Sequence, residues 1–268
     1  MKSAPSIKIM ALGFIVIAGL SGAFLFGKNR LSRMMIKPVT RGEQVSYPYI
    51  SDAVIATVRK DKSVHSVFRG GKAALITALG PEFSRLSETD LRAVFCTVVS
   101  NRMAPYGTST KMKLDELLRE KVLDCDNYAV LACILFDDKK LNMQIVGFEG
   151  GAVGNHAQLF YTNGNTKLLL DPTIGLVALA GFNDVLRGKP VPSPEIRIFG
   201  PADSKVGKFA RIVMTSIRDG KYRPSDLLYY YESVAHLEEQ NELLTEKGKS
   251  SKYRWLATPG GVTLHKRQ

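Results

Sequence analysis

The stretch HAQLFYTNGNTKLLLD, residues 156–171, limits the fold more than any other part of the chain. Two runs with strand character flank the dipeptide Asn163-Gly164. This dipeptide favours a two-residue type I′ turn, in which both central residues need positive φ. The stretch therefore predicts an antiparallel β-hairpin.

The register of this hairpin brings two polar residues together. If Thr162 pairs with Asn165, His156 lies directly opposite Asp171. Opposed residues on an antiparallel pair share a face and have Cβ atoms about 5 Å apart, so a carboxylate can accept a hydrogen bond from an imidazole N–H. A loop one residue longer would send one partner to the other face. The other three histidines lack such a setting and are interpreted as surface or packing residues.

The remaining pattern predicts an α+β fold. Ser87 and Asp90 form a capping-box-like start, and apolar residues then recur at helical spacing as far as Met103. A short helix is expected in KLDELLREKV, and another begins at Cys125. From residue 143 the period changes to that of strands, in MQIVGF, HAQLFY, KLLLDP and EIRIF. Helices followed by antiparallel strands indicate an α+β arrangement.

Both ends of the chain differ from this central part. Residues 9–27 are 19 consecutive uncharged, mostly apolar residues, about enough to cross a bilayer as a helix. We expect an uncleaved anchor, although basic residues follow it and the positive-inside rule argues for a cytoplasmic body. KPVTRGEQVSYPYISDAV predicts an extended linker. Beyond Gly200, SKVGKFARIVMTSIRDG and SDLLYYYESVAHLEEQNELL predict two amphipathic helices before a basic tail.

Composition limits the partners. The 268 residues carry a net charge of +12, which suits an anionic membrane surface or nucleic acid. No zinc-finger spacing, RNA-binding aromatic signature or clear helix-turn-helix is present, so no nucleic acid is expected. Three cysteines without ligand spacing indicate neither a disulfide framework nor a metal site. Cys96 and Cys133 fall on apolar stripes and are interpreted as core residues.

Cys125 has a different setting, because it opens a helix between Asp124 and Asp126. A helix N-terminus stabilises a thiolate, and a nearby imidazole such as His156 can take the thiol proton. The two aspartates act against this, because their charge raises the thiol pKa. We expect Asp124 to be directed away as the helix N-cap.

The sequence LDCDNYAVLACILF, the segment NHAQLFY and the segment LLLDPTIG together resemble the transglutaminase-like branch of the papain-type thiol enzymes over residues 112–175. The resemblance implies a papain/transglutaminase-like fold in which the nucleophile helix packs on an antiparallel sheet. It also implies that Cys125 is the nucleophile, His156 the general base and acid, and Asp171 the residue that orients the histidine.

The chain departs from the family pattern at three positions. Leu123 stands where members often have Gly, Gln158 where they have an aromatic residue, and Leu168 where they have Trp. No side chain that stabilises an oxyanion can therefore be assigned from the sequence. The backbone N–H of Cys125 is one contributor that the helix start offers.

The expected organisation is an anchor with its basic flank at 1–41, a catalytic domain at 42–200 and a helical extension with a basic tail at 201–268. The leading hypothesis is a membrane-anchored thiol enzyme that attacks an amide or ester carbonyl through a thioester. Hydrolysis, as in a protease or amidase, is favoured over transfer to an amine, as in a transglutaminase.

The expected partners are a protein, peptide or other amide-bearing substrate and the lipid bilayer, with no cofactor. The extracytoplasmic side is slightly favoured over the cytoplasmic side. The alternative is a catalytically inactive transglutaminase-like fold that serves as a binding or scaffold protein. A zinc enzyme is a distant third, because no short-range pair of ligands is present.

Overall fold

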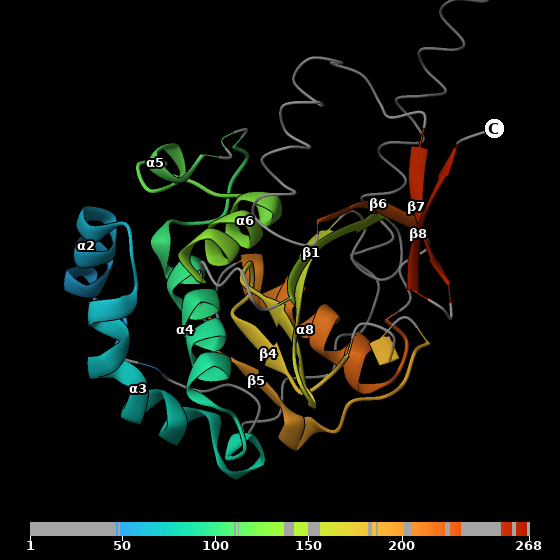
Figure 1. Cartoon of the computed structure of the whole chain (residues 1–268), viewed down its shortest axis with the longest axis horizontal. Helices are drawn as coiled ribbons and strands as arrows, with labels where there is room; N and C mark the ends of the chain where they lie inside the picture. The colour runs from blue at the N-terminus through green and yellow to red at the C-terminus, as the bar shows by residue number, and fades with distance from the viewer. Residues whose placement is uncertain are drawn as a thin grey trace, which may run out of the picture. The chain divides into compact units, whose positions relative to one another are not determined.

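An antiparallel sheet with helices on both of its faces organises the chain (Figure 1). The computed structural model describes residues 47, 49–109, 111, 113–136, 142–149, 156–181, 184–185, 187–200, 205–222, 226–231, 253–258 and 261–266. The expected anchor at 9–27 lies outside these residues. Among the helices that are described, none has the length and apolar character needed to cross a bilayer.

The helices are α2 (Asp52–Asp61), α3 (His65–Leu79), α4 (Glu88–Met103), α5 (Leu114–Leu117), α6 (Cys125–Phe136) and α8 (Lys205–Arg218), with short 3₁₀ turns η1 (Pro81–Phe83) and η2 (Ser193–Glu195). The strands are β1 (Asn142–Glu149), β2 (His156–Asn163), β3 (Thr166–Asp171), β4 (Leu176–Ala178), β5 (Ile196–Ile198), β6 (Asp226–Tyr231), β7 (Tyr253–Thr258) and β8 (Gly261–Lys266). They run in the spatial order β5-β4-β3-β2-β1-β6-β7-β8. The predicted α+β architecture, with helices packed on an antiparallel sheet, is therefore confirmed.

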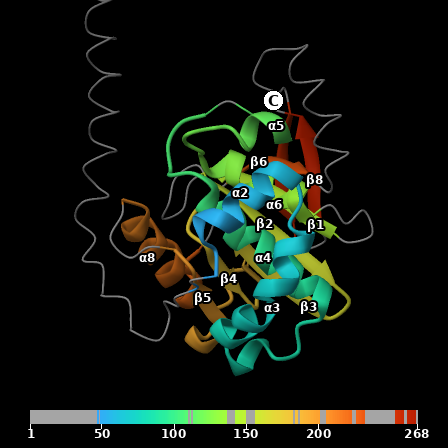
Figure 2. The same ribbon diagram turned by 90° about the vertical axis from the view of Figure 1, so that its left-hand side faces the viewer.

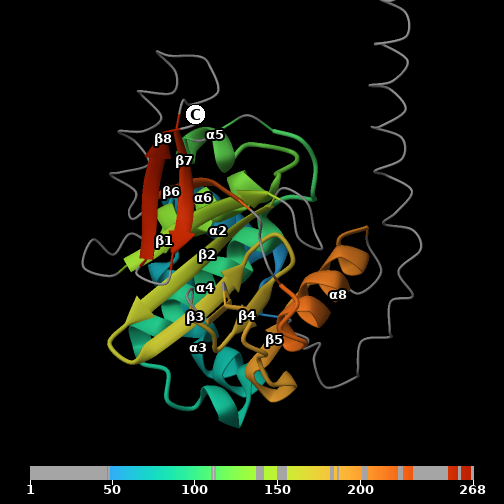
Figure 3. The ribbon, with the colours of Figure 1, turned by 90° about the vertical axis from the view of Figure 1, so that its right-hand side faces the viewer.

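Both faces of the central strands are buried. In β2, Ala157, Leu159 and Tyr161 pack with the core formed by helices α2 to α6. Phe160 points the other way and packs with the core formed by α8. Figures 2 and 3 show these layers, with α3 and α4 on one side of the strands and α8 on the other. Because side chains alternate along a strand, each strand serves two cores and reads as a continuous apolar run.

Helix α6 lies between α4 and the sheet. Nearly all of its residues from Asn127 to Phe136 are buried, and Cys133 is among them. A helix that is apolar on every side is stable only when surrounded, which explains its central position. Cys96 on α4 is also fully buried. The interpretation of both cysteines as core residues is confirmed.

The hairpin forms, but with a different turn and register from those predicted. Asn163 pairs with Thr166, so the loop is Gly164-Asn165. Gly164 has φ of 56° and Asn165 has negative φ, which is the pattern of a type II′ turn. Each β2 residue therefore pairs with the β3 residue two positions later in the chain than the type I′ turn required: Thr162, for example, pairs with Lys167 and not with Asn165. The predicted opposition of His156 and Asp171 is wrong. A shift by two residues keeps every side chain on its face, so both still share one.

The C-terminal region is only partly helical. The first predicted helix is α8, which is confirmed. The second is wrong where it is described, because Asp226–Tyr231 is strand β6, paired with β1. The basic tail contains the hairpin of β7 and β8. The tyrosines at 229–231, interpreted as helix-packing residues, are therefore strand residues.

The N-terminal linker also ends earlier than predicted, since its last residues open α2 at Asp52. Before that helix, Tyr47 donates to the carbonyl of Gly71 and Tyr49 to that of Val67 on α3.

The strand β4 was not predicted, because three residues are too few to show a period.

The capping box of α4 also binds the hairpin. The Ser87 hydroxyl accepts from the N–H of Asp90, and the Asp90 carboxylate accepts from the N–H of Ser87, as predicted. Asp90 is 1 % exposed, and its Oδ1 accepts from the Tyr161 hydroxyl at 2.7 Å and from Asn163 Nδ2 at 2.8 Å. Its Oδ2 accepts from the Thr166 hydroxyl at 3.2 Å. One carboxylate thus joins a helix start to both sides of the turn.

Replacing Asp90 by Asn is expected to lower the free energy of unfolding by about 2 to 4 kcal/mol, because the new NH₂ group faces donors. Burial raises the pKa of Asp90, but the hydrogen bonds from Asn163, Tyr161 and Ser87 outweigh it, and the net pKa is lowered. This stabilisation is full above the unfolded-state pKa and is lost as pH falls through the folded-state pKa. Urea unfolding at neutral and acidic pH measures both effects.

The matched control is Asp115→Asn, an exposed aspartate on α5 that pairs with Lys62 at the surface. This variant should change stability far less. Equal losses in the two variants, or a gap between Asp90→Asn and wild type that does not shrink toward acidic pH, would contradict the role assigned to Asp90.

Candidate active site

A buried histidine–aspartate pair lies where β2 begins and β3 ends. The Nε2 atom of His156 is 2.7 Å from Oδ2 of Asp171, and both side chains are almost inaccessible to solvent. The shifted register makes them diagonal neighbours instead of opposite ones. Diagonal pairs remain within reach of longer side chains. The predicted contact is therefore confirmed, although the register from which it was predicted is wrong.

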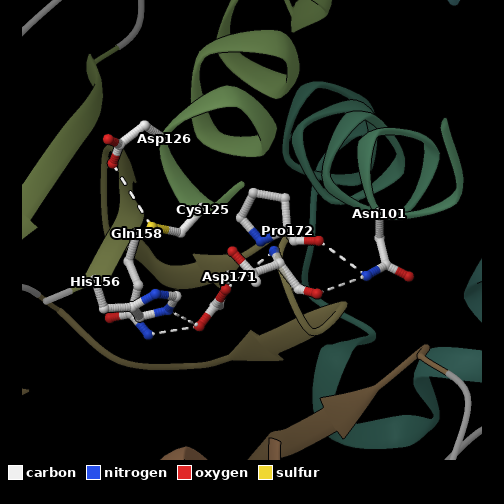
Figure 4. A network of polar contacts seen from close by, with 8 residues as sticks. Asn101, Cys125, Asp126, His156, Gln158, Asp171 and Pro172 are labelled. Carbon is white, nitrogen blue, oxygen red and sulfur yellow. Dashed lines mark hydrogen bonds and ion pairs between the residues drawn. The ribbon is translucent and has the colours of Figure 1, made fainter. Parts of the chain in front are cut away.

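Asp171 accepts two further hydrogen bonds. Gln158 donates from Nε2 to Oδ2 at 2.9 Å, and the backbone N–H of Thr173 donates to Oδ1 at 3.1 Å (Figure 4). Asn101 on α4 donates to the carbonyls of Pro172 and Thr173 and so holds the turn that follows β3. A fully buried carboxylate is tolerated as an anion when several donors surround it.

The His156 ring is covered by the helix on its own side of the sheet. Phe209 of α8 packs edge-on against the imidazole, with ring centroids 4.8 Å apart. His156 is 3 % exposed as a result of such packing. The Asp171 carboxylate can only accept, so Nε2 carries the proton in the neutral ring and Nδ1 is the basic nitrogen.

Helix α6 begins at Cys125 because Asp124 caps it. The Asp124 carboxylate accepts from the N–H of Asn127 at 3.1 Å, and the Asn127 side-chain oxygen accepts from the N–H of Asp124 at 3.0 Å. Asn127 also donates to the carbonyl of Lys111 at 2.6 Å. This reciprocal pair confirms Asp124 as the N-cap and holds Cys125 in the first turn.

Cys125 is half-buried and lies together with His156 and Asp171, the three coming from α6, β2 and β3 (Figure 4). Its Sγ lies 3.7 Å from Oδ1 of Asp126. The backbone N–H of Ala157, the residue after His156, lies close enough to the sulfur to lower the pKa of the thiol. The ladder of β2 with β3 ends at Leu159 and Leu170, next to Gln158 and Asp171.

The surroundings of Cys125 favour its neutral thiol. Burial and neighbouring negative charge raise its pKa to about 12. After burial, Asp126 contributes most, and Asp124 and Asp171 act in the same direction. The N–H of Ala157 opposes them by stabilising the thiolate. The resting protein therefore holds a protonated thiol, in agreement with the effect expected from the flanking aspartates.

The three residues predicted from the sequence, Cys125, His156 and Asp171, all lie in this site. Three further residues of the site were not predicted. Gln158 gave no signal except its departure from the family pattern, and Asn101 none, because both act through tertiary hydrogen bonds. Phe209 lies on a helix that was assigned to the extension. In the part of the chain that the structure covers, no three His, Cys, Asp or Glu side chains are grouped to hold a metal ion.

Comparison with the profiles of known families, with curated proteins and with solved structures finds no match.

Replacing Asp126 by Asn should lower the pKa of Cys125, because it removes the largest charge that opposes the thiolate. In wild type, alkylation of Cys125 by iodoacetamide should rise with pH into the alkaline range. In the variant the whole curve should move to lower pH, with several-fold faster labelling at neutral pH. Mass spectrometry of the labelled peptide, resolved from those of Cys96 and Cys133, gives the rates.

Asp52→Asn is the matched control, since Asp52 is an exposed aspartate in the first turn of α2. It should leave the Cys125 curve in place. If Asp126→Asn and Asp52→Asn give the same curve as wild type, Asp126 does not set the thiol pKa.

Proposed function

We propose that the protein is a membrane-anchored, transglutaminase-like thiol enzyme that attacks an amide or ester carbonyl with Cys125. The observation that carries the proposal is the convergence of three elements. A cysteine opens a capped helix beside a buried histidine, and that histidine is hydrogen-bonded to a buried carboxylate at 2.7 Å. Nucleophilic catalysis needs a nucleophile, a base and a group that orients the base.

The raised pKa of Cys125 supports attack by a thiol that loses its proton during the reaction. His156 takes the thiol proton at Nδ1 as the sulfur bonds to the carbonyl carbon. Asp171, buried against Nε2–H, stabilises the imidazolium that results. The N–H of Cys125, in the first turn of α6, has no intrahelical partner and is assigned to the oxyanion.

Attack of the sulfur on the carbonyl carbon gives a tetrahedral intermediate, which then breaks down. His156 returns the proton to the leaving amine or alkoxide as the C–N or C–O bond breaks, which leaves a thioester on Cys125. Water attacks the thioester with His156 again as the base, and the free acid and the thiol are restored. We favour water over an amine as the acceptor, because water needs no binding site of its own.

The alternative is a binding or scaffold protein that retains this fold without turnover. Two observations favour it: the thiol pKa of about 12 and the cover of Phe209 over His156. The main proposal also includes an anchor at 9–27 and an extracytoplasmic position of the described domain. Neither depends on whether the protein is an enzyme or a binding protein.

The test is acylation of the full-length protein by p-nitrophenyl acetate, an activated ester that needs little substrate recognition. Wild type should release nitrophenolate and carry one acetyl group on Cys125, detected by mass spectrometry. His156→Ala should slow acylation by about 10²- to 10⁴-fold, the usual contribution of a general base. Asp171→Asn should slow it as well, because the orienting anion is lost.

Cys133→Ala is the matched control, because it removes a cysteine from the other end of the same helix and should leave the rate unchanged. Circular dichroism and thermal unfolding verify that each variant is folded. Acetylation that is slow, independent of His156 and equal among the three cysteines would reject the enzyme and favour the binding protein. Adding a fluorescent primary amine separates hydrolysis from transfer, since only transfer yields the fluorescent amide.

A further inference from the structure

Gln158 occupies the position on β2 from which the Asp171 carboxylate can be reached directly. The pairing of Leu159 with Leu170, continued by one residue, places Gln158 opposite Asp171. Its Nε2 donates to Oδ2 at 2.9 Å, and this is the oxygen that His156 Nε2 contacts at 2.7 Å. The Gln158 side chain has no exposed surface.

The orientation of the Gln158 amide follows from this contact. The carboxylate can only accept, so the NH₂ group must face it. The other amide atom, Oε1, is buried and has no hydrogen-bond partner among the residues that the structure describes. A buried polar atom without a partner costs free energy, so packing alone would favour an apolar residue here. The hydrogen bond that this amide donates to Asp171 is the interaction that offsets this cost.

The register of β2 with β3 explains why Asp171 needs a second donor beside His156. His156 is diagonal to Asp171, so the carboxylate must lean along the strand to meet it. The two oxygens of Asp171 are each held by a separate donor, Oδ1 by the N–H of Thr173 and Oδ2 by Gln158. These two bonds fix the rotation of the carboxylate and aim Oδ2 at His156 (Figure 4).

We propose that Gln158 is a positioning residue of the site. It holds Oδ2 of Asp171 against His156 Nε2 and thereby keeps the imidazole in the tautomer with Nδ1 as the base. The structural part of this inference stands on the contacts alone. Its consequence for catalysis depends on the proposed function.

The experiment uses full-length protein with ¹⁵N-labelled histidine and the variant Gln158→Met, which keeps the length of the side chain and removes the donor. In wild type, NMR should show His156 as a single Nε2–H tautomer with a slowly exchanging ring proton. In Gln158→Met that proton should exchange faster, and the ¹⁵N shifts should move toward a mixture of tautomers. The His156→Ala variant identifies the signal.

Gln144→Met is the matched control. Gln144 is half-buried on the neighbouring strand β1, opposite Phe160, and receives the same chemical change. Its spectrum should match that of wild type at His156. Thermal unfolding of both variants verifies that they remain folded.

Gln158→Glu separates positioning from packing. A carboxyl group donates to Asp171 only when protonated, and an adjacent anion raises the pKa of such a group. The wild-type signal of His156 should therefore be present at acidic pH and be lost as pH rises through that raised pKa. Because Glu fills nearly the same space as Gln, a loss of the wild-type signal with rising pH cannot come from a change in packing.

A single, slowly exchanging Nε2–H tautomer in Gln158→Met, as in wild type, would overturn the inference. Acylation of Cys125 is the second readout, and it should be slower in Gln158→Met than in wild type. If the His156 signal changes while acylation never depends on His156, the positioning role stands and the proposed function fails. The two failures are therefore distinguishable.

Discussion

The buried carboxylate of Asp171 is the constraint on which the site depends. An unpaired anion inside a protein is too costly to keep, so its position requires donors from several parts of the chain at once. Those donors come from β2 and from the turn after β3, and α4 holds that turn through Asn101. The site is therefore assembled only when β2, β3 and helix α4 are all in place.

The two-sided sheet decides how the three residues of the candidate site meet. His156 and Asp171 lie on the face that α8 covers, whereas Cys125 comes from a helix packed on the opposite face. They come together where the ladder of β2 with β3 ends, and there both Asp171 and the N–H of Ala157 act on the Cys125 thiol. This arrangement leaves Cys125 half-buried while water is excluded from the histidine, which strengthens the interaction of the ring with Asp171.

The local charge around Cys125 is opposite in sign to that of the whole protein. The chain has a net charge of +12, yet Asp124, Asp126 and Asp171 all raise the pKa of the thiol. Net charge therefore says little about the chemistry of this site. A neutral resting thiol is protected from alkylation and oxidation, because the thiolate is the reactive form. Such a site needs a base at the moment of attack, which is the role we propose for His156.

Local signals in the sequence predicted α4, α6 and α8 and the strands β1, β2 and β3, but not α2 or α3. The capping box of Ser87 and Asp90 sets the start of α4, and the Asp124 cap sets the start of α6, because both involve residues three positions apart. The period of two in the strands determined that His156 and Asp171 share a face. That result survived the wrong register, since a shift by two residues preserves alternation.

Tertiary structure decided what local signals left open. The segment TNGNT accommodates two different turns, and Asn163 and Thr166 pair because both donate to Asp90 on α4. The segment Asp226–Tyr231 has a helical pattern but becomes a strand by pairing with β1. Gln158 and Phe209 join the site through contacts with residues distant in sequence. Local propensities differ by only fractions of a kcal/mol per residue, so hydrogen bonds and burial between distant segments outweigh them.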